Sequence, residues 1–247
     1  MGKRVQLWCV WAGPVFLVAY AIAFWGIAGF IPPPAPSSSA AHIAARYAEH
    51  RTGIRVGMLL GMIASFLIVP FFAIISVQIA RAEQRWPILA VIQFGCALIL
   101  EVYFVLCSML WLAATYRPEL DVATIRMLND LGWLIFVMVF PGYVIQMLCI
   151  AVAAFTDRSP HPVFPRWVGW LCVWVALSGC GGGFAVFVKS GPLAWNGAVG
   201  FYIPLSVFAV WMSVMTYVLH TGISRATDLD APVSAARVPA VPMTSAG

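Results

Sequence analysis

The stretch GCALILEVYFVLCSMLW, residues 95–111, decides the fold class of this chain. It is typical of the middle of a membrane-spanning helix, which needs about 20 apolar residues to cross the bilayer. Yet it carries a glutamate, Glu101, near its centre. A charge at that depth costs at least about 2.5 kcal/mol. We therefore expect Glu101 to be protonated and neutral at pH 7, since no Lys or Arg lies at a similar depth in any apolar segment.

The rest of the chain has the same apolar character. Of its 247 residues, 62% are hydrophobic and only 9% are charged, whereas a soluble domain carries about 25% charged residues. So few polar side chains cannot cover a water-facing surface. The apolar runs are unbroken, which excludes a membrane β-barrel with its alternating strands. The sequence therefore predicts an all-α fold, a polytopic bundle of transmembrane helices.

Six segments are long enough to cross the membrane. The segment DVATIRMLNDLGW, residues 121–133, continues helically into the fourth of them, so this span should project beyond the bilayer by two turns. The six predicted spans are 6–30, 55–80, 87–114, 130–156, 167–188 and 198–221. Together they predict one membrane domain over residues 1–225.

Two segments outside the spans have a distinct composition. Residues 31–53, IPPPAPSSSAAHIAARYAEHRTG, contain serines that can cap a short helix with Ile43 and Tyr47 on its apolar side. Such an amphipathic helix is expected to lie in the membrane interface. The tail 226–247 is rich in Ala, Pro, Val and Ser without periodicity. It is predicted to be disordered.

The net charge of +5 comes from 14 Lys and Arg residues that are scattered singly between apolar blocks. No basic run is present, so nucleic acid is not an expected partner. An even number of spans places both termini on one side. Arginines at span ends, near 81–85 and 158–166, favour the cytoplasm for that side, because cytoplasmic loops carry the excess of Lys and Arg.

Several short motifs resemble a bacterial family of six-span integral membrane proteins that is described as a domain of unknown function. They are AAHIAARYAEHRTGIRVG in the first loop, MLNDLGW at the start of span 4, and VFPRWVGW at the start of span 5. The resemblance covers most of residues 5–220. The runs GPLAWNG and CGGG depart from the family pattern. The resemblance implies a six-span protein of the bacterial inner membrane, and it implies no activity.

Polar side chains within the spans are the candidates for a binding site. Gln93, Glu101 and Ser108 follow one stripe of span 3, at about 100° per residue, and Tyr103 is close by on the same span. Gln146 in span 4 and Trp211 in span 6 carry N–H donors that a carboxyl group would seek. These six residues form the predicted substrate-binding set. The alternative for Glu101 is structural, a neutral acid that hydrogen-bonds to another span.

Breaks in helical pattern are the second indication of a pocket. Pro70, Pro141 and Pro204 lie inside spans 2, 4 and 6, and SGCGGG, residues 178–183, interrupts span 5. Proline bends a helix, and glycine runs permit close packing or a local break. The alternative is that membrane helices simply contain more Pro and Gly than soluble ones.

Cofactor and catalytic motifs are not evident. The six cysteines all lie in apolar stretches without a CxxC pair, where free Cys behaves as a small hydrophobe. Three of the four histidines lie in loops, which disfavours haem ligation. No P-loop, GxSxG or HExxH motif is present. We therefore predict no metal, cofactor or catalytic residue, and the sequence leans against an enzyme.

Three functions remain compatible with the sequence. The first is binding or carrying a small apolar or weakly acidic molecule in a mid-membrane pocket around Glu101. The second is a non-catalytic subunit or scaffold that binds a membrane-protein partner. The third is a membrane enzyme acting on lipid-like substrates, which the lack of a nucleophile or metal motif makes the weakest. In all three the lipid bilayer is the chain's immediate environment.

Overall fold

The computed structural model describes residues 2–83 and 86–229, and side chains as far as Arg225. Within these ranges the chain is helical and contains no strand. Six segments are long and apolar enough to cross a membrane: Lys3–Ile27, Arg51–Glu83, Ile88–Tyr116, Val122–Thr156, Arg166–Phe184 and Ala198–Arg225. We call them spans 1 to 6. The predicted all-α bundle of six spans is confirmed.

Most spans consist of two helical elements: spans 1, 5 and 6 change helix type along their length, and spans 2 and 4 are each divided into two α-helices. Only span 3 is one uninterrupted helix, α5 (Ile88–Tyr116). The other spans each combine two elements: α1 (Lys3–Ala21) with the π-helix η1 (Ile22–Ile27), α3 (Arg51–Ser65) with α4 (Ile68–Glu83), α6 (Val122–Val137) with α7 (Phe140–Thr156), α8 (Arg166–Gly179) with the 3-10 helix η2 (Cys180–Phe184), and the π-helix η3 (Ala198–Tyr202) with α9 (Ile203–Leu229).

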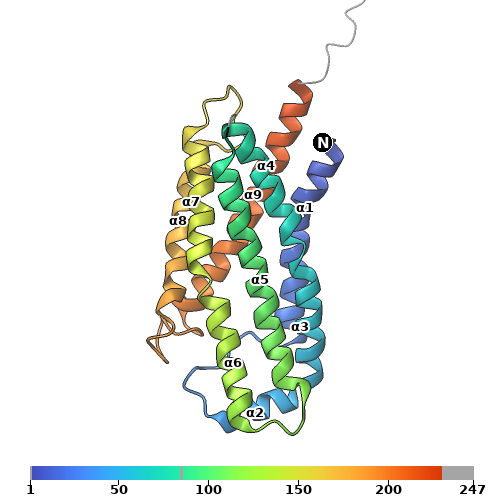
Figure 1. The fold of residues 1–247 in the computed structure, drawn as a ribbon, viewed down its shortest axis with the longest axis vertical. Coiled ribbons are helices and arrows are strands. Elements are labelled where there is room, and N and C mark those ends of the chain that lie inside the picture. Colours follow the sequence, from blue (N-terminus) through green and yellow to red (C-terminus); the bar gives the residue numbers. More distant parts are fainter. Residues whose placement is uncertain (1, 84–85, 230–247) are drawn as a thin grey trace, which may run out of the picture.

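The unbroken helix α5 joins the two sides of the bundle (Figure 1). It packs against α3 and α4 on one side and against α6 and α7 on the other. The first and last spans also pack together, through α1 and α9, and α8 packs between α7 and α9. The N-terminus and the end of α9 lie at the same end of the bundle, which we call the terminal end (Figure 1). The opposite end, which holds α2 (Ala40–Glu49), is the α2 end.

The short helix α2 packs on protein. The Ser39 hydroxyl caps it by accepting a hydrogen bond from the His42 amide at 3.2 Å. Its apolar residues Ile43 and Tyr47 are buried against α6, and the Tyr47 hydroxyl donates to Oδ1 of Asn129 at 3.2 Å. Burial raises the pKa of Tyr47 well above its ordinary value, so the hydroxyl stays protonated and can donate. The apolar face of α2 therefore packs on α6, and the position of α2 in the membrane interface stays a prediction.

Carbonyl groups at the α2 end are bonded by side chains from distant segments. Arg51 and Arg55 of α3 donate to the backbone oxygens of Thr115 and Tyr116, where α5 ends. These oxygens have no partner within their own helix. The two arginines therefore act as a C-terminal cap for span 3.

A further contact joins the two longest connections. The indole N–H of Trp195, in the loop between spans 5 and 6, donates to the backbone oxygen of Pro34 at 2.8 Å. Pro34 belongs to the loop between spans 1 and 2. We call this contact the Trp195–Pro34 bridge.

Glycines at every fourth position of α3 bring spans 1 and 2 together. A Cβ added at Gly57 would lie 2.5 Å from the backbone oxygen of Ala23, and one at Gly53 would lie 2.6 Å from that of Ile27. Both oxygens belong to η1. Any side chain at these positions would separate the two backbones, so the glycine stripe sets the close packing of spans 1 and 2.

Helix α9 extends from the predicted membrane domain, 1–225, into the predicted tail, 226–247. Helix α9 continues to Leu229, four residues beyond the predicted end of the membrane domain. Residues 230–247, most of the segment predicted to be disordered, lie outside the described residues.

Candidate functional site

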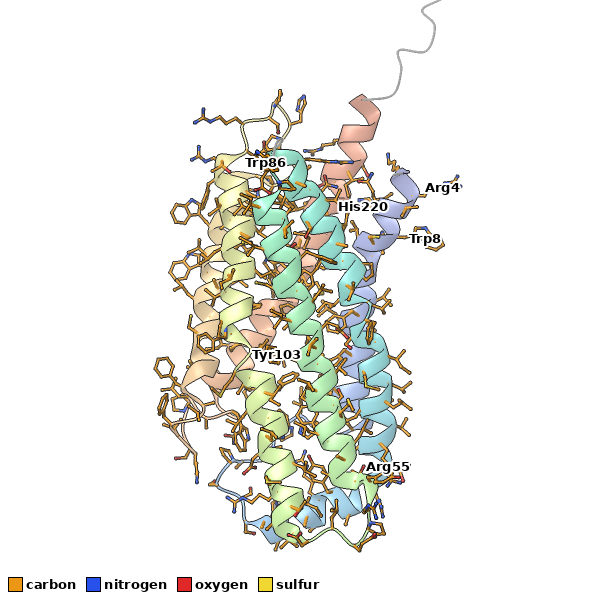
Figure 2. All side chains as sticks on the ribbon, in the orientation of Figure 1. Arg4, Trp8, Arg55, Trp86, Tyr103 and His220 are labelled. Carbon is orange, nitrogen blue, oxygen red and sulfur yellow. The ribbon has the colours of Figure 1, made fainter. Side chains whose placement is uncertain are left out.

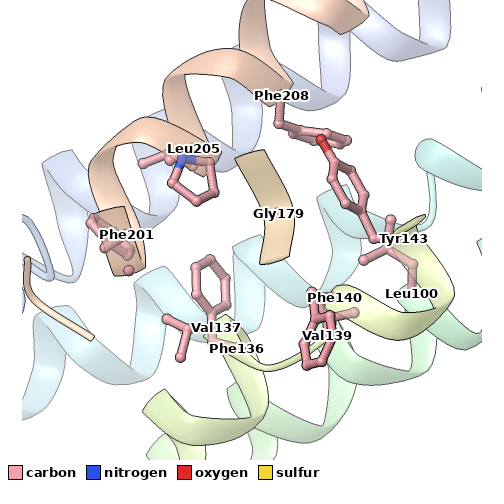
Figure 3. A pocket seen from close by; sticks show the side chains of 12 residues that line it. Leu100, Phe136, Val137, Val139, Phe140, Tyr143, Gly179, Phe201, Leu205 and Phe208 are labelled. Carbon is pink, nitrogen blue, oxygen red and sulfur yellow. The ribbon is translucent and has the colours of Figure 1, made fainter. Parts of the chain in front are cut away.

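The breaks in spans 4, 5 and 6 lie beside one cavity of about 100 Å³ (Figure 3). It lies at the junction of α6 and α7, about halfway along span 4. The lining residues come from spans 3 to 6: Leu100, Phe136, Val137, Val139, Phe140, Tyr143, Gly179, Gly200, Phe201, Pro204, Leu205 and Phe208. We call this space the mid-membrane cavity.

Two of the predicted proline breaks lie beside the cavity, and of the two prolines Pro204 lines it. Pro141 lies in the first turn of α7, directly after the break at Met138 and Val139. Pro204 lies in the first turn of α9, directly after the π-helix η3. A proline has no N–H, so it fits the first turn of a helix and cannot continue a preceding one. Both prolines thus fix the places where spans 4 and 6 change direction beside the cavity.

The glycine run of span 5 lets the backbone of this span approach spans 4 and 6 closely. A Cβ at Gly182 would overlap the backbone oxygen of Val137, at the end of α6. A Cβ at Gly181 would lie 2.5 Å from the backbone oxygen of Val199 in η3. A Cβ at Gly179 would lie 2.6 Å from the Tyr143 ring of α7. The run therefore combines both predicted roles, a local break into η2 and close packing.

Tyr143 is the one polar side chain among the residues that line the mid-membrane cavity. It is 6% exposed, and its hydroxyl has no hydrogen-bond partner among the described residues. Buried polar groups in proteins are almost always hydrogen-bonded. The cavity wall is therefore apolar, and its one polar side chain carries a buried hydroxyl, next to the Phe208 ring, with unused hydrogen-bonding capacity (Figure 3).

Glu101 lies elsewhere, on the face of α5 that packs against span 2. It is 5% exposed. Its Oε1 lies 2.8 Å from the Ser65 hydroxyl at the end of α3, and the same hydroxyl lies 2.8 Å from the backbone oxygen of Met62. A hydroxyl has one proton and cannot donate to both oxygens at once. Both hydrogen bonds form only if Glu101 supplies the second proton, so the geometry favours a neutral carboxyl.

A tyrosine of span 1 shares this region. Tyr20 packs edge-on against Phe104, three residues after Glu101, and its ring lies beside Gly61, one turn before Ser65. Neither the Tyr20 hydroxyl nor Oε2 of Glu101 has a hydrogen-bond partner among the described residues. Spans 1, 2 and 3 therefore meet around a small polar cluster of Tyr20, Ser65 and Glu101.

The other predicted residues of span 3 have separate surroundings. Gln93 is fully buried, and its Oε1 accepts a hydrogen bond from the Ser76 hydroxyl of α4. Ser108 donates at 2.8 Å to the backbone oxygen of Phe104 in its own helix. Tyr103 is half-buried near the middle of the bundle's length (Figure 2).

Gln146 and Trp211 do not bond to Glu101. The indole N–H of Trp211 points to Sγ of Cys172 at 3.4 Å, and its ring stacks between Phe72 and Phe208. Both polar atoms of the fully buried Gln146 have no hydrogen-bond partner among the described residues. Neither residue, nor Glu101, lines the mid-membrane cavity.

Sequence reasoning missed two residues of interest, Ser65 and Tyr143. Ser65 could have been found as a hydroxyl five residues before Pro70, in the middle of span 2. Tyr143 follows Pro141 by two residues, so it lies directly after the break in span 4. Each of these indications comes from a short stretch of sequence. To use either one, it is necessary to know which helix faces the break.

Metal ligands do not gather in the part of the chain that the structure describes. No group of three or more His, Cys, Asp or Glu side chains could hold a metal ion there. His220 packs edge-on against Trp11 of span 1, with ring centres 6.2 Å apart. This contact joins α9 to α1 near the terminal end (Figure 2).

Comparisons with known proteins find no match to this chain. No protein-family model matches the chain, and neither a curated protein nor a solved structure matches it. The described residues form a helical bundle with six helices long and apolar enough to span a membrane.

Proposed function

We propose that this protein binds a small apolar molecule, bearing one hydrogen-bonding group, in the mid-membrane cavity. The observation that carries the proposal is the Tyr143 hydroxyl, which is buried without a partner in an otherwise apolar wall. Ligand sites are mostly apolar, with a few polar groups that fix orientation. Tyr143 would orient the ligand, and the aromatic rings of Phe136, Phe201 and Phe208 would contact its apolar part.

The size of the cavity limits the ligand. A core cavity of about 150 Å³ is known to hold benzene. The mid-membrane cavity, of about 100 Å³, suits a small ring or the end of an alkyl chain. A fatty alcohol or a similar lipid-like molecule combines such a chain with one hydroxyl group.

The proposed ligand site does not include Glu101. The Glu101 carboxyl is already bonded to Ser65, on a face that packs against span 2. Leu100, the neighbouring residue, reaches the mid-membrane cavity instead. Because no charged side chain lines the cavity, its wall favours a neutral ligand over a charged or acidic one.

Photocrosslinking tests the ligand site. We expect a diazirine-bearing analogue of a long-chain fatty alcohol to label peptides of spans 4 to 6 in the purified protein, as read by mass spectrometry. Leu205→Trp fills the cavity and should abolish this labelling. Tyr143→Phe keeps the ring and removes the hydroxyl, so labelling should fall about fivefold, the equivalent of one hydrogen bond of about 1 kcal/mol.

The control is Leu177→Trp, which adds the same ring on a side chain that is 58% exposed on α8. It should leave the labelling unchanged. Val139→Phe provides a second, smaller filling variant if Leu205→Trp does not fold. Labelling that is spread over the outer surface of the bundle, and that ignores both filling variants, would reject the proposed site.

We also propose that the protein is a multi-pass protein of the bacterial inner membrane, with the terminal end in the cytoplasm. This proposal is supported by the basic residues of the terminal end that lie close to the span ends: Lys3, Arg4, Arg81, Arg158, Arg166 and Arg225. Three arginines of the α2 end, Arg46, Arg51 and Arg55, are bonded to backbone carbonyls. Cations near span ends orient membrane proteins with the basic side inward.

Cysteine accessibility measures this orientation. In a variant without native cysteines, Ser37→Cys in the loop before α2 should react with an impermeant maleimide in intact cells. Ser159→Cys, in the exposed loop between spans 4 and 5, should react only after the membrane is opened. The reverse pattern would place the terminal end outside.

A further inference from the structure

A second cavity, of about 680 Å³, lies at the terminal end of the bundle. One wall is the loop between α7 and α8, and the other is the last part of span 6. Its lining residues are Pro160, His161, Pro162, Val163, Pro165, Trp167, Tyr217, Val218, Thr221, Gly222 and Arg225. We call it the terminal pocket. It is separate from the mid-membrane cavity and shares no lining residue with it.

The loop and the helix that form the pocket are held together. A Cβ added at Gly222 would lie 3.0 Å from a methyl group of Val163, so the loop lies directly on α9. Three prolines restrict the loop backbone, at 160, 162 and 165. Within the same loop, the Asp157 carboxylate accepts a hydrogen bond from the Ser159 amide at 2.8 Å. The pocket is therefore built by a restrained loop.

The polar lining contains one arginine and no acidic residue. Arg225 and His161 supply N–H donors, and none of the residues that line the pocket is acidic. Among the side chains that the structure describes, which end at Arg225, no ion pair joins either residue to a carboxylate. A guanidinium group and an imidazole that line one pocket, with no carboxylate among its lining side chains, favour an anion that can accept several hydrogen bonds. Phosphate has this chemistry.

The apolar lining places the pocket at the membrane surface. Trp167 is the second residue of α8, at the start of span 5, and it is 52% exposed. Tyr217 lies two turns before Arg225 on span 6 and is 67% exposed. Tryptophan and tyrosine side chains collect where membrane spans reach the lipid headgroups. Arg225 and His161 thus lie at headgroup level, with aromatic rings in the same pocket.

We propose that the terminal pocket binds the headgroup of an anionic phospholipid. The phosphate lies between Arg225 and His161, and the acyl chains run along Trp167 and Tyr217 toward the bilayer core. Basic pockets at this level of membrane proteins are suited to anionic headgroups. A lipid fits better than free phosphate, because more than half of the lining is apolar or aromatic and borders the hydrocarbon region.

Thermal stability with added lipid tests the proposal on the full-length protein in detergent. Phosphatidylglycerol should raise Tm at a lower concentration than phosphatidylcholine, and inorganic phosphate should have no effect at the same concentration. In Arg225→Gln, the concentration of phosphatidylglycerol for a half-maximal shift should rise about tenfold, or about 1.4 kcal/mol. His161→Gln should act in the same direction with a smaller effect.

Two controls separate the site from general charge effects. Arg225→Lys keeps the positive charge and should retain most of the response to phosphatidylglycerol. Lys189→Gln removes a cation from the opposite end of the bundle and should respond like the unmodified chain. Equal shifts with the two lipids, or a shift reproduced by inorganic phosphate alone, would overturn the proposal. So would an unchanged phosphatidylglycerol response in both Arg225→Gln and His161→Gln.

Discussion

Replacing Gly182 with alanine is expected to lower the free energy of unfolding by about 3 kcal/mol. The added methyl group would overlap the backbone oxygen of Val137, where α6 ends beside the mid-membrane cavity. A backbone atom cannot move aside as a side-chain tip does, so η2 and α6 must separate. The loss should appear in unfolding titrations of the purified protein in mixed detergent micelles.

The matched control is Gly95→Ala on span 3, where a new Cβ meets no atom within 4 Å. Because alanine favours a helix over glycine by about 1 kcal/mol, this variant should be unchanged or slightly more stable. Similar stabilities for the two alanine variants would contradict the close packing of spans 4 and 5. Separation of these spans should also abolish the photolabelling of the mid-membrane cavity.

Glu101→Ala is expected to destabilise the protein by about 1–3 kcal/mol, whereas Glu101→Gln should fold almost normally. The alanine removes the partner of Ser65 and leaves a void between spans 2 and 3. A glutamine amide keeps the shape, and its N–H can donate to the Ser65 hydroxyl as the protonated carboxyl does. Equilibrium unfolding of both variants in the same micelles gives the comparison.

A double-mutant cycle with Ser65→Ala isolates the contact between the two side chains. Coupling of about 1 kcal/mol is expected, since the residues share one hydrogen bond. An ionised Glu101 would give another result: Glu101→Gln would then change stability substantially, because it would replace a buried charge by a neutral amide. Equal losses for glutamine and alanine would also exclude the neutral, bonded carboxyl.

The fold could be predicted because lipid imposes a simple pattern. A span is recognised by its length and apolar composition alone, and loops at the ends of spans carry the few charges. The extension of α6 and the helix at 40–49 followed from capping residues and helical spacing. What α2 packs against could not be predicted, since a helix with Ile43 and Tyr47 on one side suits lipid and protein equally well.

The site was harder to predict, because rotation of a helix about its axis is not fixed by composition. Membrane helices are apolar on all sides, so the sequence does not say which face of α5 meets which span. Glu101 was therefore paired with Gln146 and Trp211 across the bundle, while in the structure it bonds to Ser65 of the adjacent span. The breaks at Pro141 and Pro204 did indicate the place of the cavity. The identity of its single polar residue, Tyr143, depended on that unknown rotation.

The Trp195–Pro34 bridge has a consequence for the order in which the chain is assembled during synthesis. Spans 1 to 3 can pair as soon as they leave the ribosome, because the glycine stripe of α3 and the Ser65–Glu101 bond need only neighbouring spans. The bridge and the packing of α1 on α9 join segments from opposite ends of the chain. Until spans 5 and 6 are inserted, span 1 thus lacks the neighbour that covers its remaining side. A nascent chain arrested before residue 195 should therefore be a better substrate for membrane proteases than one arrested after α9.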